Sequence, residues 1–124
     1  MRSSASGALT FQAVYYLGTG VWPLISMRSF EAVTGPKIDR WLVRMVGLLA
    51  ASDGLALAAG LAAKSPSRET LVLAISSALA FAAIDVVYVA KRRISPLYLG
   101  DAVIEAALIF HHLKYALRQK GEAP

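Results

Sequence analysis

Acidic side chains interrupt the most apolar parts of this sequence, and they are the residues best suited to chemistry. Asp85 precedes a short basic turn, Asp101 and Glu105 follow it, and Asp53 stands alone in an earlier apolar stretch. A charged residue at the centre of a bilayer costs at least ~2.5 kcal/mol on insertion scales. We therefore expect all four to face inward, paired or protonated, where they can bind protons or a cationic group.

The depth of these residues along their helices suggests which of them meet. Arg44, Asp85 and Asp101 each lie a few residues inside an apolar stretch, roughly 6–8 Å below the same surface. They form a candidate ion-paired layer, which could equally do no more than fix helix register. Glu105 is one turn deeper than Asp101 on the same face, and Asp53 is near mid-depth. These two are the deepest candidates for a ligand or proton site.

Other kinds of site find less support in the sequence. It contains no cysteine, which excludes thiolate catalysis and cysteine-based zinc or iron–sulfur sites. Asp101 and Glu105 could share a cation, but His112 is ~10 Å beyond Glu105 along a helix, and no Glu-x-x-His pair of the di-iron type is present. No Ser-His-Asp spacing or glycine-rich phosphate loop is found. We predict no metal, no cofactor and no catalytic residue, and we favour a binding role while leaving catalysis open.

Four apolar stretches must carry these residues. Hydrophobic residues make up 56% of the 124 and charged residues only 17%, and the polar ones gather in short intervals, which is typical of a membrane protein. Each stretch is about 20 residues or longer, the length that crosses ~30 Å of hydrocarbon as a helix. We predict one all-α integral membrane domain over 1–124. It is a bundle of four transmembrane helices with both termini on the same side, at about 8–26, 36–63, 66–90 and 96–117.

Two of these helices carry further patterns. Gln12 and Tyr16 belong to a polar and aromatic stripe on the first helix, which is either packing at an interface or a ligand-lining wall; we assign Tyr16 to the candidate site. The second helix has small residues at every fourth position: Ala50, Gly54 and Ala58. Such a row lets another helix approach closely in lipid, and we expect it to pack on the third helix, within one chain or across a dimer.

The intervals between the stretches contain helix-start signals. Proline follows a small residue at 35–36, 65–66 and 95–96, and proline suits the first turn of a helix, with serine as its cap. The longest polar interval, 27–40, mixes apolar and charged residues, which indicates a short amphipathic segment at the membrane surface.

The charge pattern predicts partners. The net charge is +5, and the basic residues lie at the ends of apolar stretches, so we expect contact with the lipid bilayer and none with nucleic acid. We predict a multi-pass protein of the cell inner (plasma) membrane, and leave open its orientation and whether it forms a homodimer or a larger membrane complex.

Several segments resemble a group of small, uncharacterised bacterial four-helix integral membrane proteins: 15–24, 30–37 with 39–43, and 85–90 with 93–96. The resemblance covers nearly the whole chain and implies the architecture without an activity. Small multidrug transporters have a similar size, but their key glutamate lies in the first helix, which here has no acid.

Two functions are consistent with these patterns. In the first, Asp53, Asp85, Asp101 and Glu105, with Arg44 and Tyr16, bind or translocate protons or a small cationic or amphipathic ligand. In the alternative, the chain is a non-catalytic accessory or assembly subunit of a membrane complex, docking through its small-residue faces. A lipid-modifying enzyme is the least supported hypothesis. A polar cavity at Asp53 or Glu105 would favour the first function, and a solid core with outward-facing small residues the second.

Overall fold

The chain folds into helices throughout the part that the structure, a computed structural model, describes, namely residues 2–63 and 65–122. The helices are α1 (Arg2–Ile25), α2 (Met27–Thr34), α3 (Arg40–Gly60), α4 (Arg68–Ala90) and α5 (Tyr98–Glu122). No strand occurs among the described residues, so the prediction of an all-α fold is confirmed.

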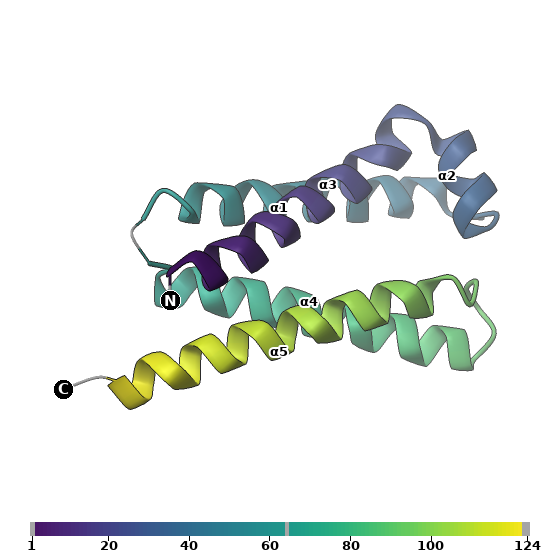
Figure 1. The fold of residues 1–124 in the computed structure, drawn as a ribbon. Coiled ribbons are helices and arrows are strands. Elements are labelled where there is room, and N and C mark those ends of the chain that lie inside the picture. Colours follow the sequence, from purple (N-terminus) through teal and green to yellow (C-terminus); the bar gives the residue numbers. More distant parts are fainter. Residues whose placement is uncertain (1, 64, 123–124) are drawn as a thin grey trace.

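The four long helices form two antiparallel hairpins, α1 with α3 and α4 with α5 (Figure 1). The start of α1 and the end of α5 lie at the same end of the molecule as the α3–α4 connection, while α2 and the α4–α5 turn lie at the other end (Figure 1). Among the helices that the structure describes, α3 and α4 are the two that are long and apolar enough to cross a membrane on length and composition alone, which by itself is weak evidence of a membrane protein.

The helix starts differ from those marked by the prolines. Helix α3 begins at Arg40, four residues after Pro36, because Asp39 directly before it has a non-helical backbone with φ −94° and ψ 77°. Helix α4 begins at Arg68, where Ser67 accepts a hydrogen bond from the Thr70 amide. The prolines at 36, 66 and 96 therefore precede their helices by two or more residues, and at α4 a later residue makes the cap.

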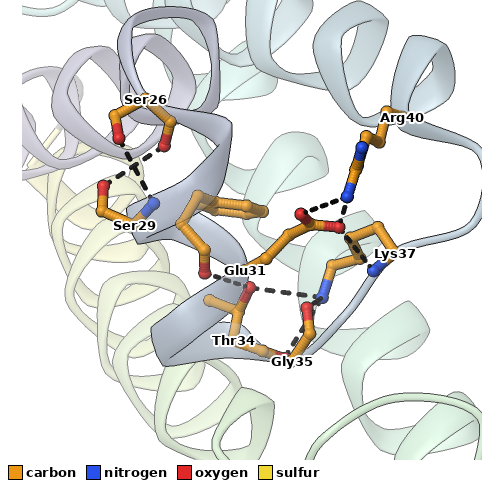
Figure 2. Close-up of polar contacts among 8 residues, drawn as sticks. Ser26, Ser29, Glu31, Thr34, Gly35, Lys37 and Arg40 are labelled. Carbon is orange, nitrogen blue, oxygen red and sulfur yellow. Dashed lines mark hydrogen bonds and ion pairs between the residues drawn. The ribbon is translucent and has the colours of Figure 1, made fainter.

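Helix α2 and the loop after it are held together by one carboxylate. Glu31 accepts hydrogen bonds from the Lys37 amide at 2.8 Å and from the Arg40 guanidinium at 2.9 and 3.2 Å (Figure 2). The Lys37 ammonium donates to the carbonyl oxygens of Thr34 and Gly35 at the end of α2 (Figure 2), and it lies 5.2 Å from the centre of the Tyr98 ring. The short segment expected in 27–40 is therefore a helix that is tied both to α3 and to the start of α5.

Within the chain, Gly47 and Gly54 of α3 pack against α1 rather than against the third long helix that was expected, and packing of small residues across a dimer stays a prediction. A Cβ atom on Gly20 of α1 would lie 2.5 Å from the Gly47 carbonyl oxygen, and one on Gly54 would lie 2.8 Å from the carbonyl oxygen of Ala13. Ala58, the third member of the expected row, is exposed. Helix α1 has its own small residues on the facing side, so the two backbones approach each other closely.

Candidate functional site

The main group of buried polar side chains lies between α1, α4 and α5. Each of its most buried members is 5% exposed or less: Gln12, Tyr16, Asp85, Glu105 and His112. Such groups are costly to bury unless their hydrogen bonds are satisfied inside the protein. Their hydrogen bonds therefore show what the site can do.

Two consecutive tyrosines of α1 reach two acids of α5 that are one turn apart. Tyr16 donates its hydroxyl hydrogen to Glu105 Oε1 at 2.7 Å, and Tyr15 donates to Asp101 Oδ1. Asp101 and Glu105 share a face of α5 because residues four apart in a helix lie one above the other. The two bonds connect the two hairpins across the core.

Three carboxyl groups form a cluster at this point, which we call the carboxyl cluster: Asp85, Asp101 and Glu105. The side chain of Asp101 lies within hydrogen-bonding reach of both Asp85 and Glu105. A hydrogen bond between two carboxyl groups requires a proton on one of them, because an ionised carboxylate only accepts. Asp85 Oδ2 is buried with no hydrogen-bond donor. The arrangement is thus one in which carboxyl groups can share protons.

Gln12 extends this network away from the cluster, and its bonds fix the direction of each hydrogen. Its amide nitrogen lies 2.9 Å from the Ala74 carbonyl oxygen and 3.1 Å from the Tyr16 hydroxyl, and its Oε1 lies 2.7 Å from His112 Nε2. A backbone carbonyl only accepts, so the nitrogen of the amide must face Ala74 and Oε1 must face His112. Nε2 of His112 therefore carries a hydrogen, and the Tyr16 hydroxyl, which accepts from Gln12, points its own hydrogen at Glu105.

Asp53 and Arg44 lie apart from the carboxyl cluster. Asp53 accepts a hydrogen bond from Ser77 at 2.8 Å, where α3 meets α4. Arg44 is exposed, and the expected ion-paired layer with Asp85 and Asp101 is not formed: across residues 2–63 and 65–122, the ion pair found is Arg40 with Glu31. Equal depth does not bring Arg44 to the acids, because α3 packs chiefly on α1 whereas the acids belong to the α4–α5 hairpin.

The surroundings of the cluster limit what it can bind. One groove lies between α1 and α5 beside Phe11 and Ile104, another lies between α4 and α5 beside Leu71 and Tyr115, and no carboxylate lines either of these two. No three His, Asp or Glu side chains of the described residues converge closely enough to hold a metal ion. The geometry suits protons better than a metal ion or a bulky molecule.

Sequence reasoning placed Tyr16 and the three acids of the cluster in the candidate site but left Gln12, Tyr15 and His112 out of it. Signals for two of them were present. Gln12 is one turn before Tyr16 on the same face of α1, and His112 continues the face of α5 that carries Glu105. Nothing in the sequence alone pairs Tyr15 with Asp101, because that contact depends on how two distant helices are rotated.

Comparison with known protein families, with curated proteins and with solved structures finds no match to this chain. The family resemblance expected from the sequence segments therefore stays a prediction, and function must be argued from the geometry.

Proposed function

We propose that this chain is a small multi-pass protein of the cell inner membrane, in which all four long helices cross the bilayer and the carboxyl cluster binds protons. A small cationic group that replaces a shared proton is the second possible ligand. Asp85, Asp101 and Glu105 hold the protons, and Tyr15 and Tyr16 orient two of the carboxyl groups. Lipid is the partner that surrounds the bundle.

The membrane part of this proposal is supported by the burial of polar side chains together with the exposure of large apolar ones. Glu105 and His112 are each 1% exposed, while Val103 on the same helix is 70% exposed and Val14 of α1 is 64% exposed. Water-soluble proteins bury their large apolar residues and seldom bury acids, and a monomer rarely exposes extensive apolar surface without a partner. Lipid acyl chains can cover the exposed apolar side chains on all outer faces of the bundle.

The same observation explains why α1 and α5 do not qualify as membrane spans on length and composition alone, whereas α3 and α4 do. Their polar residues are the ones turned inward, such as Gln12 and Tyr16 on α1 and Glu105 and His112 on α5. Large apolar residues lie on their outward faces, including Phe11 and Phe110. A helix of this kind can cross a bilayer despite its composition, because polar groups that face the bundle are satisfied there.

The alternative of a non-catalytic accessory subunit has one observation in its favour, which is that neither groove reaches a carboxylate. Its expected docking surface is weakened, however, because Gly47 and Gly54 are buried against α1. We therefore rank proton binding first.

The proposal is tested by infrared difference spectroscopy on the full chain in lipid, recorded between an acidic and an alkaline pH. We expect a protonated-carboxyl signal that Glu105→Gln removes or shifts, because the neutral amide can still accept the Tyr16 hydroxyl hydrogen without titrating. Asp53→Asn is the matched control, since Asp53 lies outside the cluster. A spectrum unaffected by Glu105→Gln, Asp85→Asn and Asp101→Asn, or a chain that stays in water without detergent, would overturn the proposal.

A further inference from the structure

His112 is a buried titratable side chain that the carboxyl cluster does not use. It is 1% exposed, and no group of the described residues forms a hydrogen bond with its buried Nδ1 atom. Because the orientation of the Gln12 amide places a hydrogen on Nε2, the neutral imidazole must leave Nδ1 as a bare lone pair. The Nδ1 lone pair can accept either a hydrogen bond or a proton.

We propose that His112 is a second proton site of the bundle, reached from the end at which α5 finishes, and that the Gln12 amide separates it from the carboxyl cluster. This inference rests on the proposed function, because it assumes that the bundle spans a membrane and binds protons at the cluster. The inference adds His112 as a second proton site, a route by which protons reach it, and a barrier between His112 and the carboxyl cluster.

The groups that face His112 leave it free to accept a proton at Nδ1. On α5 the neighbouring titratable residues are His111, Tyr115 one turn further on, and Glu105 two turns back. On α1 the contacting group is the uncharged Gln12. On α4 it is the Ala74 carbonyl, reached through Gln12.

Arg68 of α4 lines the same groove as Tyr115. Glu69, five residues before Ala74, is exposed, and Asp85 lies eleven residues after it, in the cluster. Asp53 of α3 is occupied by the Ser77 hydroxyl. Among the described residues no anion is paired with the imidazole, and burial disfavours its charged form, so His112 takes up a proton only on acidification.

Access to His112 comes from a groove between α4 and α5. The groove has a volume of about 540 Å³ and includes Ser65, Tyr115 and Gln119 among its lining residues. Tyr115 is one helical turn beyond His112 on α5, and the imidazole itself does not line the groove. The carboxyl cluster lies nearer the α4–α5 turn, because Glu105 is two helical turns before His112 on α5. The two sites are thus neighbours along the bundle, and Gln12 and Tyr16 lie between them.

Gln12 is the barrier because an amide has no group that titrates near neutral pH. Both hydrogens of its nitrogen are engaged, one by Ala74 and one by Tyr16, and its oxygen is engaged by His112. The Tyr16–Gln12–His112 chain therefore transmits hydrogen-bond orientation but passes no proton. A carboxyl group at the same position could accept a proton on one oxygen and release one from the other.

The first test reads His112 directly. The chain has two histidines, and His111 is exposed, so His111→Gln leaves one imidazole for ring-nitrogen NMR in lipid. We expect Nε2 to be protonated at neutral pH and Nδ1 to gain a proton on acidification. A bare Nε2, or an Nδ1 that never gains a proton while the fold persists, would overturn the inference. Such a result would leave the infrared signal of the carboxyl cluster unchanged. The inference about His112 can therefore be wrong while the proposed function still holds.

The second test measures proton leak in liposomes that contain the full chain. Gln12→Glu should create a leak that the unaltered protein lacks, because it connects the two sites with a titratable group. Gln12→Met, of similar length but without a titratable group, is the control and should create none. An equal leak in both variants, or no leak in Gln12→Glu when NMR shows His112 still in place, would contradict the barrier role.

The third test uses the absence of native cysteine. Ala116→Cys lies in the groove beside Tyr115, whereas Leu113→Cys lies on the exposed apolar side of α5. A membrane-impermeant thiol reagent should label the first and spare the second. Labelling of neither position would show that water does not reach this groove and would overturn the proposed access.

Discussion

Tyr16 donates its hydroxyl hydrogen to Glu105 Oε1 at 2.7 Å, and the bond joins α1 to α5 where both side chains are 1% exposed. The same hydroxyl accepts from Gln12. One oxygen atom therefore sets the orientation of a buried acid and of a buried amide, and it is one of the polar links between the two helical hairpins, with Tyr15–Asp101 and Asp53–Ser77. The stability of the bundle should depend on it.

Tyr16→Phe should destabilise the protein, because it leaves a buried acceptor on Glu105 and a donor on Gln12 without partners. Unsatisfied buried groups cost about 1–3 kcal/mol each, although polar bonds inside membranes have averaged closer to ~0.6 kcal/mol. The measurement is the unfolding midpoint in detergent. Tyr88→Phe is the control, since its ring contact with Lys91 does not need the hydroxyl. Equal midpoints for the two variants would contradict the role assigned to Tyr16.

Gly20→Ala and Gly18→Ala should have opposite effects although they are two residues apart in α1. Alanine favours a helix over glycine by about 0.8–1 kcal/mol, and a Cβ on Gly18 meets nothing within 4 Å, so that variant should be neutral or stabilised. A Cβ on Gly20 would press on the backbone of α3 at Gly47 and Ala51. Gly20→Ala should therefore lower the unfolding midpoint. If both variants behaved alike, the close approach of α1 and α3 would be wrong.

The helices themselves were predictable from the sequence, but their partners were not. Length and hydropathy locate four long helices to within a few residues at most ends, because each apolar stretch must satisfy its own backbone. The periodicity of α5 also predicts that Asp101, Glu105 and His112 share a face. Depth along a helix, in contrast, suggested that Arg44 meets Asp85, and the structure separates them because depth says nothing about which hairpin a helix joins.

The α2 segment should lose stability in acid through Glu31. The hydrogen bond from Arg40, followed by that from the Lys37 amide, lowers the pKa of Glu31 below its usual value. A carboxylate whose folded-state pKa is depressed contributes stability that is present above the unfolded-state pKa and is lost as the pH falls through the folded-state value. We therefore expect the loop after α2 to become more susceptible to proteolysis below about pH 4.

Glu31→Gln should abolish that acid sensitivity. The loop should then be cleaved as readily at neutral pH as the unaltered protein is in acid. Glu69→Gln, which alters an exposed acid in the first turn of α4, is the control and should leave the loop unchanged. Acid-dependent cleavage that persists in Glu31→Gln would show that another group controls the segment.

Asp53 and Ser77 should behave as a structural pair that joins α3 to α4. Their 2.8 Å bond lies where these two helices meet, away from the carboxyl cluster. A double-mutant cycle with Asp53→Asn and Ser77→Ala isolates the interaction, because it subtracts the effect that each change has alone. We expect a coupling free energy between about 0.6 and 1.7 kcal/mol, the range found for polar bonds between membrane helices. Ser76→Ala is the matched control, since that exposed hydroxyl bonds only to its own helix at Leu73. A coupling free energy near zero, together with loss of the infrared carboxyl signal in Asp53→Asn, would show that Asp53 belongs to the proton site and not to a structural pair between α3 and α4.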